Sequence, residues 1–128
     1  MDREVIVPEN VYKTGGFSQA IKVGNVVYVA GVVGIDDNGD ISNDPETQAT
    51  QMWINIKNIL EAAGAELEDL VQITTYITKA EYGEKVLPAR RKLWTREPQP
   101  TATLVVCTAL AEPEYLIEAN GIAVISKT

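Results

Sequence analysis

Histidine is absent from this sequence, and cysteine occurs once, at Cys107. Without histidine the chain cannot build a Ser-His-Asp triad, a Cys-His pair or a histidine-ligated zinc site. A single cysteine cannot form an intramolecular disulfide, which agrees with a reducing compartment, and its ordinary interpretation is a small buried hydrophobic residue. Any catalysis by this chain is therefore expected from a carboxylate.

Basic residues and long apolar runs are also scarce. Lysine and arginine total 11 against 18 aspartates and glutamates, which gives a formal net charge of -7 and a pI of about 4.5. This charge repels phosphate backbones and anionic lipids, so we expect no nucleic acid and no membrane as partners. No stretch approaches the roughly 20 apolar residues of a spanning helix, and the first residues lack the apolar region of a signal peptide. We expect a cytoplasmic protein.

What remains is the composition of an ordinary globular protein, with 45% hydrophobic residues, 23% charged residues and a mean hydropathy of -0.05. A chain of 128 residues buries about two-thirds of the surface that its unfolded form exposes. We therefore predict a single domain over residues 1–128.

The first half of the chain predicts a β-hairpin. The extended residues 18–23 and the β-branched run 26–33 are separated by Gly24 and Asn25. The acidic stretch 36–40 then predicts a turn. Because the run 26–33 is apolar on both faces, we expect another subunit to bury its second face; a buried central strand in a monomer is the alternative.

Two helices are predicted. Asp44 as N-cap and Pro45 at the first helical position indicate a helix start, apolar residues follow at a spacing of about 3.6, and Gly64 is expected to end this helix. The second helix is predicted over residues 80–94. Pro88 lacks an N–H group, so we expect a kink or a break there.

Three further segments, residues 71–78, 101–108 and 115–124, have the composition of strands. With residues 71–78 as a third or fourth strand, the order β-β-β-α-β-α-β-β predicts an α+β fold, in which two helices cover one face of a mixed sheet.

Glu118 is the strongest candidate for chemistry, because it lies in the otherwise mostly apolar strand 115–124. Its neighbours Leu116 and Ile117 are expected to raise its pKa by desolvation, toward a range in which one carboxylate takes a proton from water and returns it. Asn120 lies two residues further on, on the same strand face. A solvated or ion-paired strand glutamate is the alternative interpretation.

Three parts of the sequence together resemble the RidA (YjgF) family: residues 15–31, residues 55–65, and the segments 100–103 and 117–124. The resemblance covers nearly the whole chain. It implies a chorismate-mutase-like subunit and a homotrimer, in which the sheets face a central barrel and three clefts lie between subunits. In the best-known members these clefts hydrolyse enamines and imines of amino acids to keto acids and ammonia, without a cofactor or a metal.

The active-site pattern of the deaminating members is largely absent, so the chain resembles a divergent member. At the position of Ala102 they carry an arginine that grips the substrate carboxylate, and at the position of Leu104 they usually carry a cysteine. Cys107 lies three residues further on and does not replace that cysteine. Where the family has a tyrosine and a serine, this chain has Phe17 and Ala30.

Gly31 and Glu118 are the residues of that pattern that remain. Loss of one partner of a shielded arginine–carboxylate pair costs about 2–5 kcal/mol, or roughly 30-fold to several thousand-fold in transition-state binding. We therefore expect a small substrate without an α-amino-acid carboxylate, with Glu118 as general acid and base. Backbone N–H groups near Gly31 and Thr103 are expected to hold a carbonyl oxygen. The predicted substrate-binding residues are Phe17, Ala30, Gly31, Ala102, Thr103, Leu104 and Asn120.

Other interpretations stay open. The missing arginine, tyrosine and cysteine favour a non-catalytic trimer that binds a small molecule or acts as a chaperone. The basic stretch Arg90–Arg96 either supplies a replacement cation to a cleft or complements the negative end of its helix. Ribonuclease activity, sometimes attributed to the family, is disfavoured by the net charge of -7 and the absence of histidine.

Overall fold

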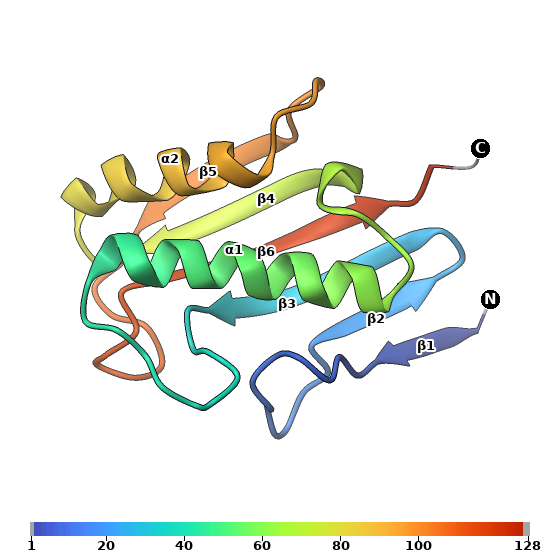
Figure 1. The fold of residues 1–128 in the computed structure, drawn as a ribbon, viewed down its shortest axis with the longest axis horizontal. Helices are drawn as coiled ribbons and strands as arrows, with labels where there is room; N and C mark the ends of the chain where they lie inside the picture. Colours follow the sequence, from blue (N-terminus) through green and yellow to red (C-terminus); the bar gives the residue numbers. More distant parts are fainter. Residues whose placement is uncertain (1, 127–128) are drawn as a thin grey trace.

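The computed structural model describes residues 2–126, and in this part of the chain six strands form one mixed sheet with both α-helices on the same face (Figure 1). The predicted α+β class is confirmed. The strands are β1 (Arg3–Ile6), β2 (Ala20–Val23), β3 (Val26–Val33), β4 (Leu70–Ile77), β5 (Thr101–Val106) and β6 (Ile117–Val124). The helices are α1 (Pro45–Ala62) and α2 (Gly83–Leu93), with short 3-10 helices at Leu67–Asp69 and Ala80–Tyr82.

The sheet has the strand order β1-β2-β3-β6-β4-β5, so β6 lies in its interior although it comes last along the chain. Neighbouring strands are antiparallel except for β4 and β5, which are parallel and are connected through α2. Figure 1 shows α1 above β3 and β6, and α2 on the β5 side of the sheet. Glu118 is therefore carried by an interior strand, where it pairs with Val33 of β3 and Tyr76 of β4.

Helix α1 begins where the sequence predicts. The Asp44 carboxylate accepts hydrogen bonds from the Thr47 N–H at 2.9 Å and from the Thr47 hydroxyl at 2.8 Å, and Pro45 is the first helical residue. Gly64, with a φ of 82°, follows the end of the helix. The predicted N-cap and end are confirmed. The apolar face that α1 buries against the sheet consists of Ala49, Met52, Trp53, Ile56, Ile59 and Leu60.

The second predicted helix differs in detail. Its first residues form the 3-10 helix Ala80–Tyr82, and α2 then continues through Pro88 without a break. A proline leaves the carbonyl four residues earlier without its helical N–H partner. Here both Pro88 and Glu84 are exposed, so water can solvate that carbonyl.

Within the described residues, no helix is long and apolar enough to cross a membrane.

The face of the sheet opposite the helices is apolar and open. Val5 is 54% exposed, Tyr28 51% and Val124 36%. Val27 and Val29, which point to the helix side of β3, are buried. Strand β3 is thus covered on only one face within a single chain, and the interpretation as a strand buried on both faces of a monomer is wrong.

Gln48 on α1 is fully buried and forms hydrogen bonds to the segment that leads into β6. Its side-chain nitrogen donates to the carbonyls of Ser42 at 2.7 Å and Glu114 at 2.8 Å. Its side-chain oxygen accepts the Leu116 N–H at 3.0 Å. The backbone of Gln48 also lies so close to Gly34 that a Cβ at this glycine would collide with it.

Asn55, two turns further along α1, forms similar hydrogen bonds to the end of β3. Its buried side-chain nitrogen donates to the carbonyls of Val33 at 3.0 Å and Ile35 at 2.8 Å. Gln51 donates to its side-chain oxygen at 2.9 Å. Together, Gln48 and Asn55 fix the end of β3 and the start of β6, the two places where Gly31 and Glu118 are found.

We predict that Gln48→Leu lowers the free energy of unfolding by about 3 kcal/mol, because three backbone groups lose a buried partner. Urea denaturation followed by circular dichroism measures this change. The control is Gln51→Leu, which removes one partly buried hydrogen bond and should cost about 1 kcal/mol. Equal losses for the two variants would contradict the anchoring role of Gln48.

Candidate active site

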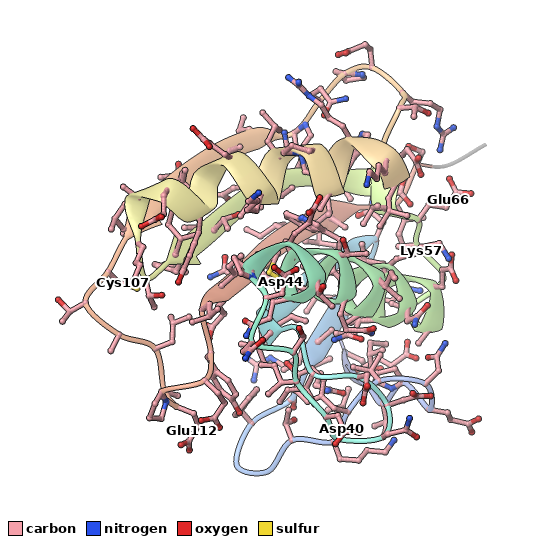
Figure 2. The ribbon with its side chains drawn as sticks, turned by 60° about the vertical axis from the view of Figure 1, so that its left-hand side comes forward. Asp40, Asp44, Lys57, Glu66, Cys107 and Glu112 are labelled. Carbon is pink, nitrogen blue, oxygen red and sulfur yellow. The ribbon has the colours of Figure 1, made fainter. Side chains whose placement is uncertain are left out.

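A cavity of about 500 Å³ opens where β3 ends and β6 begins. Its floor comes from these two strands, and its walls come from the loop before β2 and the loop between β5 and β6. Figure 2 shows Glu112 on the second of these loops. The cavity is lined by Tyr12, Lys13, Thr14, Gly15, Phe17, Ala30, Gly31, Val33, Ile35, Ala111, Glu112, Tyr115 and Glu118.

Glu118 and Gly31 meet at the floor of this cavity. The register between β3 and β6 shifts between Val29 and Val32, so Gly31 lies in an irregular part of the ladder. A Cβ added to Gly31 would collide with the carboxylate of Glu118. Only glycine therefore lets this carboxylate lie directly against the backbone of β3.

The carboxylate of Glu118 is partly withdrawn from water. Burial raises its pKa above the ordinary value of 4.5, as the apolar sequence around it predicts. The salt bridges among residues 2–126 involve Glu61, Glu66 and Glu68, and none involves Glu118. The interpretation of Glu118 as an ion-paired strand residue thus finds no support within one chain, and its raised pKa suits a proton acceptor and donor.

Tyr12 is a polar group of this cavity that no sequence pattern indicates. Its hydroxyl oxygen accepts the Val33 N–H at 2.9 Å, so its own proton is not used in that contact. Burial raises its pKa; the Val33 hydrogen bond acts in the opposite direction, and the negative charge of Glu118 adds to the rise. Tyr12 therefore remains a neutral hydrogen-bond donor beside the carboxylate. It lies five residues before Phe17, and no periodic pattern marks it.

The remaining titratable groups of the cavity, such as Tyr115 and Lys13, come from its loops. Burial raises the pKa of Tyr115, as do the carboxylates of Glu112, Glu114 and Glu118. Lys13 also lines the cavity, and its ammonium group donates to the carbonyl of Pro8 at 3.0 Å. Within residues 2–126, no three side chains of histidine, cysteine, aspartate or glutamate form a group that could hold a metal ion.

The predicted binding residues are divided between two cavities of the chain. Phe17, Ala30 and Gly31 lie with Glu118 in the cavity just described. A second cavity, of about 280 Å³ and lying between α2 and β5, is lined by Thr75, Gly83, Val86, Leu87, Arg90, Ala102, Thr103 and Leu104. Asn120 lies on the open face of β6 opposite Thr74, outside the walls of both cavities as the described residues form them.

Comparison with known proteins identifies the family to which this chain belongs. The chain belongs to the family described as Endoribonuclease L-PSP, whose sequence model matches residues 8–125. Relatives with RutC and RidA names confirm the resemblance to the RidA (YjgF) family.

Particular relatives match to different extents. A RutC family protein of Pyrococcus abyssi is 48% identical over 80 residues, which cover 60% of this chain and 63% of that protein, less than two thirds of its length. The 3-aminoacrylate deaminase RutC of Acinetobacter baylyi is 30% identical over 130 residues, covering 96% and 98% of the two chains. The solved structure of RidA from an Antarctic Psychrobacter species has a TM-score of 0.90 at 31% identity, covering 95% of this chain and 99% of that one.

We predict that Gly31→Ala displaces the carboxylate of Glu118 from the floor of the cavity. The added methyl group would overlap the flexible end of the glutamate, so the side chain should move toward solvent while the fold persists. The pKa of Glu118 should then fall toward 4.5, because desolvation is what raises it. Carbon-detected NMR titration of the glutamate carboxyl groups measures this change.

The control for this substitution is Gly15→Ala. A Cβ at Gly15 would meet no heavy atom within 4 Å, so the titration of Glu118 should not change. An unchanged pKa of Glu118 in Gly31→Ala would show that the close contact between the two residues does not position the carboxylate.

Proposed function

We propose that this protein is a RidA-like hydrolytic deaminase, in which Glu118 acts as general acid and base on a small imine or enamine. The observation that carries the proposal is the Glu118 carboxylate, which lies against Gly31, partly desolvated, at the floor of a cavity of about 500 Å³. Names of relatives add support, because they include a 3-aminoacrylate deaminase and a 2-iminobutanoate/2-iminopropanoate deaminase.

In the proposed reaction, water attacks the imine carbon while Glu118 takes one of its protons. The protonated carboxyl group then gives this proton to the nitrogen, which forms a carbinolamine. Glu118 next takes the proton of the new hydroxyl group and passes it to the nitrogen, so that the C–N bond breaks, ammonia leaves and a carbonyl group remains on the carbon. An enamine first accepts a proton on carbon from the protonated carboxyl group and becomes an iminium ion, which returns a proton from its nitrogen to the carboxylate and leaves the imine. The neutral hydroxyl of Tyr12 serves as a hydrogen-bond donor to the polar group that develops beside Glu118. The reaction requires no cofactor.

The proposed substrate has no carboxylate on the reacting carbon. The position at which the family's deaminating members carry an arginine is Ala102, and their tyrosine and serine are replaced by Phe17 and Ala30. These side chains offer apolar contact and no charge. Both Phe17 and Ala30 line the cavity of Glu118, so the reacting end of the substrate is expected to be uncharged and partly apolar.

We also propose a cytoplasmic homotrimer, in which the open face of the sheet packs against two further copies and the clefts lie between subunits. The support is the exposed apolar surface of Val5, Tyr28 and Val124 on this face. Such an arrangement would also bring the cavity of Glu118 next to residues of a neighbouring copy.

A second candidate is a non-catalytic trimer that binds a small molecule. It is favoured by one observation, the absence of the family's arginine and cysteine at Ala102 and Leu104. A binding protein of this kind would be stabilised by its ligand without forming a product.

We expect Glu118→Gln to lower ammonia release at least about 100-fold, because the amide cannot accept the proton of water. The assay uses 2-iminopropanoate and the neutral imine of 2-butanone, each generated in situ by an oxidase and followed by ammonia detection. The matched control is Glu114→Gln, the same change on the exposed loop outside the cavity. Full activity of Glu118→Gln would exclude the assigned role, and no activity of the wild type on any imine would favour the binding protein.

We expect Tyr28→Glu to convert the trimer into monomers, because a buried unpaired carboxylate costs several kcal/mol at each copy of the contact. Light scattering coupled to size-exclusion chromatography gives the mass. Ala62→Glu adds the same charge on an exposed position of the helix layer and should leave the trimer intact. A wild-type protein that is monomeric, or a Tyr28→Glu variant that stays trimeric, would contradict assembly through this face.

A further inference from the structure

Aromatic side chains line the cavity of Glu118 from two loops. Tyr12 and Phe17 come from the loop before β2, and Tyr115 comes from the loop between β5 and β6. The ring of Phe17 is 56% exposed, so it contributes little to the core of one chain and remains accessible to a ligand in the cavity. The cavity therefore offers ring faces to whatever enters it.

Two carboxylates line the same cavity as these rings. Glu118 lies at the floor and is partly withdrawn from water, whereas Glu112 is exposed on the loop between β5 and β6 (Figure 2). We call Phe17, Glu112 and Tyr115 the outer wall, because Phe17 and Glu112 are exposed and Tyr115 is only half-buried. The outer wall thus combines aromatic surface with a negative charge.

The electrostatics of Tyr115 show that the negative charges converge on this wall. Burial raises the pKa of its hydroxyl group, and the carboxylates of Glu112, Glu114 and Glu118 raise the pKa further. Each of these carboxylates therefore acts on the same tyrosine from a different position along the chain. A positive charge placed beside the ring of Tyr115 is attracted by all of them.

Lys13 is the positive side chain on the walls of this cavity, and it does not neutralise the carboxylates through an ion pair. Its ammonium group donates to the carbonyl of Pro8 at 3.0 Å. The salt bridges in the part of the chain that the structure describes use Lys57 and Arg96 instead. Within one chain the cavity therefore keeps an excess of negative charge, which attracts cations and repels anions.

An aromatic face beside a carboxylate is a favourable environment for an organic cation. The negative face of the ring attracts an ammonium group, and this attraction is strongest where water is partly excluded. The carboxylate adds a counter-charge to the same group. A bare metal ion fits less well, because the described residues provide no group of three carboxylate, histidine or cysteine ligands.

We infer that the outer wall binds an ammonium group that the substrate carries at the end away from its reacting carbon. Glu112 supplies the counter-charge, and the ring of Phe17 supplies the cation–π surface. The substrate is then the imine or enamine of a short amino ketone or amino aldehyde, for which a cavity of about 500 Å³ has room. The reaction at Glu118 rests on the proposed function; the ammonium site does not.

The test is a binding experiment with three ketones, which stand for the carbonyl product and release no ammonia. All three are built on 2-pentanone and differ in the group on its last carbon. This group is trimethylammonium in 5-trimethylammonio-2-pentanone, the uncharged tert-butyl group of the same shape in 6,6-dimethyl-2-heptanone, and a carboxylate in 5-oxohexanoate. Isothermal titration calorimetry on the full chain measures the three dissociation constants.

We expect the wild type to bind the ammonium ketone about tenfold more tightly than the tert-butyl ketone, and 5-oxohexanoate most weakly. Glu112→Gln should weaken binding of the ammonium ketone about fivefold and leave the tert-butyl ketone unaffected. The matched control is Glu114→Gln, the same change at an exposed position of the same loop outside the cavity. It should weaken binding less than about twofold, because its charge acts at longer range through water.

Phe17→Leu tests the aromatic contact separately, because it keeps an apolar side chain and removes the ring. Binding of the ammonium ketone should weaken about threefold, and binding of the tert-butyl ketone should change less. Equal losses for both ketones would contradict the cation–π contact. Equal binding of the ammonium and tert-butyl ketones by the wild type, equal losses in Glu112→Gln and Glu114→Gln, or no saturable binding of the ammonium ketone would overturn the ammonium site.

The ammonia assay separates this inference from the proposed function. If the wild type releases no ammonia from any imine but still prefers the ammonium ketone through Glu112, the deaminase proposal fails and the ammonium site stands. If ammonia release depends on Glu118 but the ammonium ketone binds no better than the tert-butyl ketone, the proposed function stands and the ammonium site is wrong.

Discussion

The two buried amides of α1 are the interaction on which the candidate site depends. Gln48 and Asn55 present side-chain donors and acceptors to backbone groups at the end of β3 and in the segments that follow β3 and precede α1 and β6. Removing such a partner from a buried backbone group is more costly than the hydrogen bond itself contributes. Helix α1 therefore holds the ends of β3 and β6 rigidly, and the relation between Gly31 and Glu118 follows from that rigidity.

The sheet held in this way by α1 carries the carboxylate of Glu118, a group that is unfavourable for folding. The partly desolvated carboxylate of Glu118 forms no salt bridge within residues 2–126, and its ionised form opposes the folded state as pH rises above its ordinary pKa. A partly buried arginine on α2 is unfavourable for the same reason. Two unpaired charges of opposite sign, each lining its own cavity, are better explained by contact with other molecules than by the stability of one chain.

The sequence predicted the class of fold, the start and end of α1 and the elevated pKa of Glu118, because these features depend on neighbours along the chain. Helix capping, apolar spacing and the residues that flank Glu118 are all local. The position of Tyr12 beside Glu118 was not predictable, because it results from a loop that approaches the end of β3. Of the kink or break expected at Pro88, the break did not occur, since an exposed helix face tolerates an unpaired carbonyl. The division of the predicted binding residues between two cavities depends on strand order, which hydrophobic patterning does not encode.

The interior place of β6 has a consequence for how the protein is made. A ribosome that has produced β1 through β5 has exposed two sheet fragments with a gap between β3 and β4, and the strand that carries Glu118 must enter this gap. Until then Gly31 faces no carboxylate, and two apolar strand edges lie open to other chains. Insertion of β6 between β3 and β4 therefore closes the sheet and completes the cavity of Glu118 in the same step.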